Sequence, residues 1–191
     1  SSQTLFDIVT SGTPEELEKT IKAGANVNER NSEGRTPLMS ASALTQNPEI
    51  IETLVRAGAN VNDRTPEGVT PLMLAAYNTT NPEVIETLIK AGANVNERDS
   101  NGRTPLMIAS AGNQNPEVIE TLIREGANVN ERNSNGRTPL IFASMSNQNP
   151  EIIETLIKAS ANVNDRTLEG WTPLMIASLS NQNPEVITVL L

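Results

Sequence analysis

Residues 92–106 read GANVNERDSNGRTPL, and close copies of this stretch recur along the chain. Its Thr-Pro-Leu marker returns every 34 residues, with threonines at Thr36, Thr70, Thr104, Thr138 and Thr172. Two further markers, Gly-Ala-Asn-Val-Asn and Asn-Pro-Glu, keep the same step, although Ser160 replaces the glycine in one copy. Three markers in one register predict an array of repeated units that stack on their neighbours.

Each copy predicts two short helices. Thr36 is an N-cap followed by proline at the first helical position, so we expect a first helix to about Leu44. Asn47 starts a second helix in the same way, over 48–57. The apolar residues of this helix form the stripe of a helix buried on one side: Ile50, Ile51, Leu54 and Val55.

Two glycines in each copy predict special backbone geometry. Gly58 follows the second helix, where a left-handed cap is needed, and Ser160 at the matching place should cost about 1 kcal/mol. A second glycine precedes each Thr-Pro pair and indicates a hairpin-like turn with positive φ. These turn glycines are Gly34, Gly68, Gly102, Gly136 and Gly170.

The order of turn, short helix and longer helix, with Gly-x-Thr-Pro-Leu and Gly-Ala-Asn-Val-Asn, resembles the ankyrin repeat over essentially the whole chain. The resemblance implies an all-α repeat solenoid, an array of helix-turn-helix units joined by β-hairpin-like turns. We expect a single domain over 1–191. It would contain an N-terminal cap repeat (1–30), four full repeats (31–64, 65–98, 99–132 and 133–166) and a partial last repeat (167–191).

Two departures from the family pattern leave this expectation in place. Methionine or isoleucine replaces the family's usual histidine after Thr-Pro-Leu, so packing must take over its role in the turn. The step of 34 residues is one longer than the family's usual repeat, and the extra residue falls between the two helices, around Thr45 and Gln46.

The ends of the array differ from its interior. Glu16 and Thr20 stand where inner copies have apolar residues, which suits a terminal repeat without a preceding neighbour. Glu16 also suits a capping box with Thr13, and both interpretations can hold together. The last copy stops inside its second helix, with Val189 at a place where earlier copies have threonine. We expect either that the natural chain continues or that this apolar end self-associates.

Composition narrows the classes of function. The chain of 191 residues has a net charge of -9 and contains neither cysteine nor histidine. The charge counts against nucleic acid as a partner, and no apolar run approaches the roughly 20 residues needed for membrane insertion. Without thiols or imidazoles, we expect no catalysis, no metal site and no cofactor. The chain begins Ser-Ser-Gln rather than Met, so its localisation, including a processed secreted or periplasmic form, stays open.

By resemblance, a partner protein binds on the concave face formed by the turn tips and the first helices. Exposed positions there lie just before Thr-Pro-Leu and late in the first helix. Arginine, methionine and the chain's single tryptophan and tyrosine fall at these positions, and such residues are favoured at interfaces. The predicted partner-binding residues are Arg35, Val69, Tyr77, Arg103, Arg137, Met145, Trp171 and Leu179.

Alternatives stay open for this face and for the whole chain. Trp171 and Tyr77 can instead cover neighbouring repeats, whereas Phe142 aligns with core positions. The arginines before Thr-Pro-Leu can attract an acidic segment, or they can simply offset acidic residues in the turns. The copies over 83–107 and 117–141 are nearly identical. The alternative function is therefore an engineered or consensus-like scaffold with no natural partner.

Overall fold

The computed structural model describes residues 4–191, so the expected cap repeat over 1–30 is described from Thr4 onward. This part of the chain forms twelve helices and no strand. It divides into two compact units, one that ends at Asn94 and one that begins at Val95. Each unit is an all-α array of repeats, whereas the expectation of one domain over 1–191 stays a prediction.

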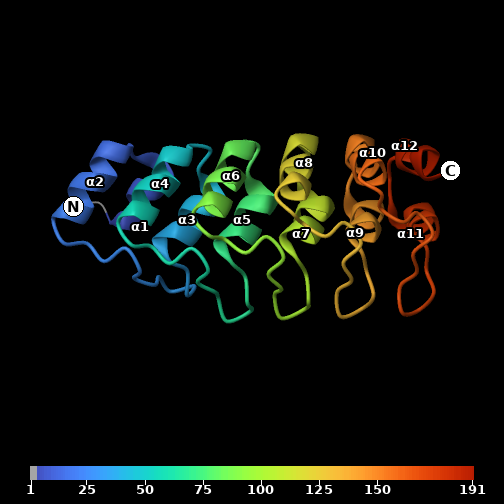
Figure 1. The fold of residues 1–191 in the computed structure, drawn as a ribbon, viewed down its shortest axis with the longest axis horizontal. Helices are drawn as coiled ribbons and strands as arrows, with labels where there is room; N and C mark the ends of the chain where they lie inside the picture. Colours follow the sequence, from blue (N-terminus) through green and yellow to red (C-terminus); the bar gives the residue numbers. More distant parts are fainter. Residues whose placement is uncertain (1–3) are drawn as a thin grey trace. The chain divides into compact units, whose positions relative to one another are not determined.

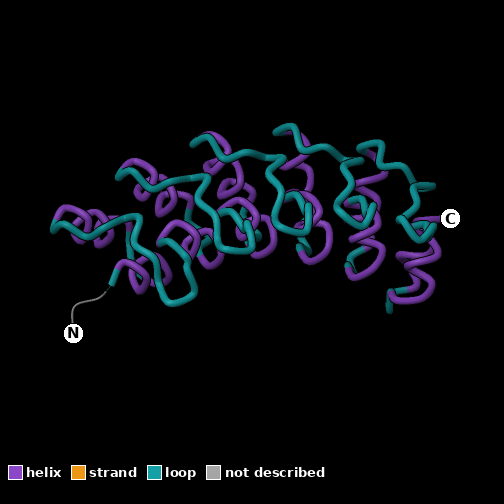
Figure 2. The backbone as a smooth tube through the Cα atoms, turned by 90° about the horizontal axis from the view of Figure 1, so that it is seen from below, coloured by secondary structure: helices purple, strands orange, loops and turns teal. Residues whose placement is uncertain are grey.

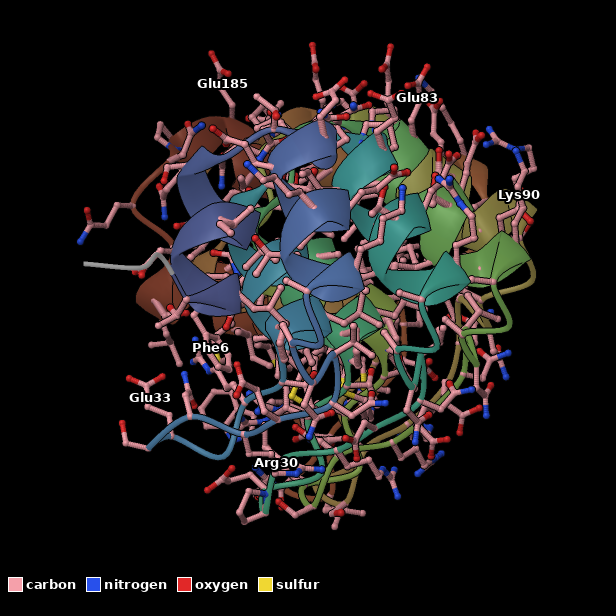
Figure 3. The ribbon with its side chains drawn as sticks, turned by 90° about the vertical axis from the view of Figure 1, so that its left-hand side faces the viewer. Phe6, Arg30, Glu33, Glu83, Lys90 and Glu185 are labelled. Carbon is pink, nitrogen blue, oxygen red and sulfur yellow. The ribbon has the colours of Figure 1, made fainter. Side chains whose placement is uncertain are left out.

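In the N-terminal unit, the first helices α1, α3 and α5 pack side by side, and the second helices α2, α4 and α6 form a layer above them (Figure 1). The loops between repeats project below the first helices, and Arg30 and Glu33 lie there, on the opposite side from Glu83 (Figure 3). The helices are α1 (Leu5–Ser11), α2 (Pro14–Lys22), α3 (Pro37–Leu44), α4 (Pro48–Arg56), α5 (Pro71–Asn78) and α6 (Pro82–Lys90).

The C-terminal unit repeats this arrangement, with α9 between α7 and α11 and with α10 between α8 and α12. Loops connect the helices throughout the described chain, and none of these loops contains a strand (Figure 2). The helices are α7 (Pro105–Gly112), α8 (Pro116–Arg124), α9 (Pro139–Ser146), α10 (Pro150–Lys158), α11 (Pro173–Ser180) and α12 (Pro184–Leu190).

The expected helix starts are confirmed. The Thr36 hydroxyl accepts a hydrogen bond from the Met39 amide at 3.3 Å, and the Asn47 side chain accepts one from the Glu49 amide at 3.0 Å. Thr13 and Glu16 form the expected capping box at the start of α2. These contacts satisfy amides that the helix itself leaves without partners.

Helix α1 was not anticipated from the sequence, because the first copy lacks Thr-Pro-Leu. Thr4 caps it through a capping box with Asp7, and its apolar residues Leu5, Ile8 and Val9 are buried. The Thr-x-x-Asp spacing and the i, i+3, i+4 apolar pattern are the signals that could have revealed this helix.

Aliphatic and methionine side chains form the core. Leu38, Met39 and Leu54 are fully buried in the N-terminal unit, and Met107 is equally buried in the C-terminal unit. These methionines occupy the places that follow Thr-Pro-Leu, so packing does replace the family's usual histidine there. Their flexible thioethers fill the space between successive first helices.

The left-handed positions are also confirmed. Gly58 has φ 95°, and Ser160 has φ 70°. Ser160 is the one non-glycine residue with positive φ in the described part of the chain. A side chain in this region costs about 1 kcal/mol relative to glycine. The Ser160 carbonyl still accepts a hydrogen bond from Asn130 at 3.1 Å, so the link to the preceding repeat is kept.

The two asparagines of Gly-Ala-Asn-Val-Asn have different roles. The first acts locally, since Asn26 accepts a hydrogen bond from the Asn28 amide at 3.0 Å. The second reaches the next repeat: Asn28 donates to the Gly58 carbonyl and accepts from the Asn60 amide, both at 3.0 Å. Asn96 makes the matching pair of bonds in the C-terminal unit. The second asparagine therefore links each repeat to the next.

Candidate functional site

The turns place the five predicted residues that precede Thr-Pro-Leu at equivalent positions. In the third such turn, the Asp99 amide donates to the Arg103 carbonyl at 3.0 Å, and the Gly102 amide donates to the Asp99 carbonyl at 2.9 Å. These two bonds make the hairpin-like turn without extending into a strand ladder. The same pair of bonds recurs in the turns that end at Arg35, Val69, Arg137 and Trp171.

The other predicted residues lie late in the first helices. Tyr77 in α5 is 53% exposed, and Leu179 in α11 is 72% exposed, so both present large apolar surface to the outside. Met145 at the matching place in α9 is half-buried. Tyr77 and Leu179 are therefore accessible at the surface of their units.

The C-terminal unit brings four predicted residues together around one cavity of about 260 Å³, here named the Trp171 pocket. Trp171 itself is 44% exposed, so it partly covers its neighbours and partly remains accessible. The lining also contains residues that we did not single out, among them Glu169 just before the turn glycine. The pocket is lined by Arg137, Met145, Thr167, Glu169, Trp171, Ile176, Leu179 and Ser180.

A second cavity, the Arg103 pocket, has a volume of about 370 Å³ and shares Arg137 and Met145 with the first. Phe142 lines it and is only 7% exposed, which confirms its predicted place in the core. The Arg103 pocket is otherwise polar and is lined by Ser100, Asn101, Arg103, Asn133, Ser134, Asn135, Arg137, Phe142 and Met145.

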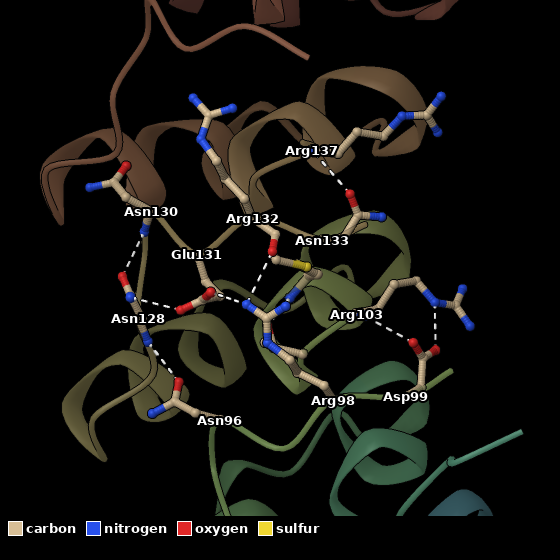
Figure 4. A network of polar contacts seen from close by, with 12 residues as sticks. Asn96, Arg98, Asp99, Arg103, Asn128, Asn130, Glu131, Arg132, Asn133 and Arg137 are labelled. Carbon is tan, nitrogen blue, oxygen red and sulfur yellow. Dashed lines mark hydrogen bonds and ion pairs between the residues drawn. The ribbon is translucent and has the colours of Figure 1, made fainter. Parts of the chain in front are cut away.

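The arginines at the turns differ in their partners. Arg103 donates through Nε to the buried Asp99 carboxylate at 2.7 Å, and Arg35 lies 3.4 Å from the exposed Glu33 carboxylate. Arg137 has no carboxylate within ion-pair distance among the described residues, and its side chain donates to the Met145 sulfur at 3.8 Å. Figure 4 shows this contrast between Arg103 and Arg137.

The Trp171 pocket also contains one negative charge. Hydrogen bonds from the Glu169 backbone amide and from the Thr167 hydroxyl lower the pKa of Glu169, and the charge of Arg137 lowers it further. Glu169 therefore stays ionised to a lower pH than an ordinary glutamate. The pocket thus combines an apolar wall with one positive and one negative side chain.

The three remaining predicted residues belong to the N-terminal unit. Arg35 and Val69 are half-buried at their turns, and the Val69 amide donates to the Thr65 hydroxyl at 3.3 Å. Tyr77 is more accessible than either. The two pockets of the C-terminal unit include none of these residues, so their part in binding stays a prediction.

The paired charges of the turns are structural. Arg132 donates to the Gly136 carbonyl at 3.0 Å, to the Arg166 carbonyl at 2.7 Å and to Asp165 at 2.8 Å. Arg30 makes the corresponding bonds in the N-terminal unit. These arginines link one repeat to the next.

Further cavities recur between neighbouring second helices. One lies between α2 and α4, and a similar one lies between α8 and α10. Their linings share an Ile, a Thr, an Ala and basic and acidic side chains at matching places in the repeat. Because these notches recur with the repeat, they reflect helix packing rather than a special site.

The last repeat exposes apolar surface that other repeats bury. Met175 is 45% exposed, whereas the matching Met107 is fully buried in α7, which packs against the following first helix, α9. Leu191 at the end of the described chain is 88% exposed. Self-association through this end stays a prediction.

Residues 4–191 lack two other kinds of feature, a metal-binding cluster and a membrane-spanning helix. No cluster of three or more acidic, histidine or cysteine side chains that could hold a metal ion occurs there. Among the helices of this part of the chain, none combines the length and the apolar character needed to cross a membrane.

Comparison with known protein families matches the chain to the family described as ankyrin repeats (3 copies), in overlapping stretches over 5–99, 42–133, 74–167 and 106–191. A search among curated proteins found no match. Ankyrin repeats are general protein–protein interaction modules, and proteins built from them are typically not enzymes. The family match spans nearly the whole chain and agrees with the stacked helix pairs, so this chain belongs to the ankyrin repeat family.

Proposed function

We propose that this chain binds a partner protein through the turns and first helices, with the Trp171 pocket at the centre of the contact. The observation that carries the proposal is the pocket itself, where Trp171, Leu179 and Met145 surround a cavity beside Arg137. Tryptophan and arginine dominate the energetics of protein interfaces, and methionine is enriched there. The other predicted residues, Arg35, Val69, Tyr77 and Arg103, are proposed as further contacts because they occupy the same kind of positions in their repeats.

The size of the pocket supports a protein rather than a small molecule as the occupant. Small-molecule sites typically have volumes of about 300–1,000 Å³ and bury most of the ligand. A cavity of about 260 Å³ beside two exposed apolar residues instead suits one or two side chains of a larger partner. The surrounding polar turns would then form the rim of the interface.

The test is affinity capture from a lysate of the source organism, read by mass spectrometry. The test variant carries Trp171→Ala and Leu179→Ala, which remove the exposed walls of the pocket. The matched control carries Glu154→Ala and Lys158→Ala, which remove an exposed pair on α10 outside both pockets. Circular dichroism melts show that each variant remains folded.

We expect a specific protein that the parent chain and the control retain and that the test variant loses. Equal retention by all three chains would move the binding site away from the Trp171 pocket. The absence of any specific protein would contradict the proposal and favour the alternative, an engineered or consensus-like scaffold with no natural partner.

A further inference from the structure

The turns over 99–103 and 133–137 differ in a single residue, since Asp99 is replaced by Asn133. Both side chains hold their turn in the same way. One Asp99 oxygen accepts from the Asn101 and Arg103 amides at 2.9 and 2.8 Å. The Asn133 oxygen accepts from the matching amides at 3.0 and 2.9 Å. The backbone of the turn is therefore equally well supported in both repeats.

The second side-chain atom makes the difference. The other Asp99 oxygen accepts from Arg103 Nε at 2.7 Å, whereas the matching atom of Asn133 is an amide nitrogen, which can only donate. Arg137 therefore loses the acceptor that Arg103 has. Its Nε is the one buried side-chain polar atom in the described chain that has no hydrogen-bond partner.

Among the described residues, Arg137 is consequently a partly buried cation with no carboxylate within ion-pair distance, although the charge of Glu169 lies in the same pocket. Its side chain lines both the Trp171 pocket and the Arg103 pocket, so it is reached from the surface on which we propose the partner binds. A polar or charged group that has lost water without gaining a partner is energetically costly. A carboxylate that pairs with the terminal guanidinium nitrogens would offset part of the cost of holding this charge away from water, although Nε itself stays covered.

We infer that the partner segment carries an aspartate or glutamate side chain that pairs with Arg137, next to a large apolar side chain that enters the Trp171 pocket. The inference rests on the proposed function and specifies the chemistry of the partner. Guanidinium and carboxylate groups form paired, charge-assisted hydrogen bonds of matching geometry. The covered Nε leaves the terminal nitrogens of Arg137 to make this contact.

The other charges around the pocket set the direction of approach. Glu169 lines the same pocket and repels a second carboxylate, so the acidic side chain must approach Arg137 from the side away from Glu169. Arg103 and Arg35 contribute little, because Asp99 and Glu33 already compensate their charges. Of these three arginines, Arg137 is therefore the one that is free to pair with a carboxylate of the partner.

The probe is a library of random peptides displayed on phage and selected on the purified chain of residues 1–191. The peptides are joined to the coat protein through their carboxyl ends, so only side-chain carboxylates are offered. We expect the selected peptides to contain aspartate or glutamate close to Leu, Ile, Met or Phe. Amidated synthetic copies are then titrated against the chain, with the fluorescence of its single tryptophan as the readout.

Four chain variants test the pairing. Arg137→Gln should weaken binding about tenfold, the scale expected for a charged hydrogen bond, whereas Arg103→Gln should change it less than about twofold. Asn133→Asp keeps Arg137 but gives it an internal carboxylate, so it should weaken binding nearly as much as Arg137→Gln. Glu169→Gln removes the repulsion and should tighten binding about twofold.

A double-mutant cycle decides whether the contact is direct. Replacing the acidic residue of the peptide with its amide should weaken binding to the parent chain but not to Arg137→Gln, so the two losses should not add. Additive losses, or peptides that need no acidic residue, would overturn the inference.

The cycle also separates this inference from the proposed function. Peptides that Trp171→Ala abolishes and Arg137→Gln leaves unaffected would refute the acidic partner while supporting the binding pocket. If no selected peptide depends on Trp171, both the inference and the proposed pocket fail.

Discussion

The turns over 99–103 and 133–137 are two versions of one structural element with different consequences. Their backbones make the same hydrogen bonds, and each is held by an acidic or amide side chain at its first position. In the first turn, Asp99 also binds Arg103, whereas in the second turn Arg137 stays without a carboxylate. A change of one side-chain atom from oxygen to nitrogen thus separates a turn whose arginine is paired with a carboxylate from a turn whose arginine is not.

The comparison shows that stability and binding capacity are set by different atoms of the same residue. One side-chain oxygen is sufficient to hold the turn. The other terminal atom of the same side chain, oxygen in Asp99 and nitrogen in Asn133, decides whether the neighbouring arginine has a hydrogen-bond acceptor within the turn. Substitutions at these two positions should therefore change two properties separately: the stability of the array, and whether the arginine of the turn is paired with an acceptor in that turn.

The largest effect is expected from removing each turn-holding side chain. Asp99→Ala deletes two bonds to backbone amides and one to Arg103, and should lower the free energy of unfolding by about 2–3 kcal/mol. Asn133→Ala deletes only the two amide bonds and should cost about 1–2 kcal/mol. Urea unfolding followed by circular dichroism measures both, and equal losses would show that the Arg103 pair adds nothing.

A smaller effect is expected from converting the first turn into the second. Asp99→Asn keeps the acceptor for the backbone amides but removes the acceptor for Arg103 Nε. The Asp99 side chain is buried and the Arg103 side chain is 40% exposed, so we expect a loss of about 1 kcal/mol in urea unfolding. A variant as stable as the parent would mean that solvent fully replaces the lost carboxylate.

The reverse conversion should have the opposite sign. Asn133→Asp supplies Arg137 with the acceptor that it lacks and should raise the free energy of unfolding by up to about 1 kcal/mol. The same substitution combined with Arg137→Gln provides the control, since the gain should disappear without the guanidinium. A gain that survives in the double variant would come from the turn backbone rather than from the arginine.

The smallest effect concerns pH. The turn over 133–137 has no ionisable group at its third position, whereas the turn before Trp171 has Glu169, whose pKa is lowered by hydrogen bonds from its own amide and from Thr167. A lowered folded-state pKa contributes stability that is present above the unfolded value of 4.5 and is lost as the pH falls through the folded value.

Thermal melts between pH 6 and about pH 3 should therefore show a small advantage of the parent chain over Glu169→Gln that shrinks at the acidic end. NMR titration of the Glu169 side chain gives the matching direct measurement. A midpoint at or above the ordinary glutamate value would contradict this prediction, because the hydrogen bonds would then not favour the ionised form.

Local features were readable from the sequence. The N-caps at Thr36 and Asn47, the left-handed Gly58 and the strained Ser160 each depend on contacts within a few residues, so the pattern of residue types was sufficient. The repeated markers further identified the array, but of the eight positions predicted to be exposed, Tyr77, Trp171 and Leu179 are exposed and the other five are half-buried. Helix α1 was the local element that we did not predict, because its Thr4 cap does not match the Thr-Pro-Leu marker.

Contacts between repeats were decided only by the tertiary structure. Asn28 and Gly58 are bonded across 30 residues, and the Trp171 pocket joins side chains from two successive turns and first helices. Residue types do not reveal such contacts, because they depend on how one repeat stacks on the next. The sequence placed Arg103 and Arg137 at equivalent positions, but only the packed structure showed that Arg137 lacks a partner, since that depends on which neighbouring atoms come within hydrogen-bond distance.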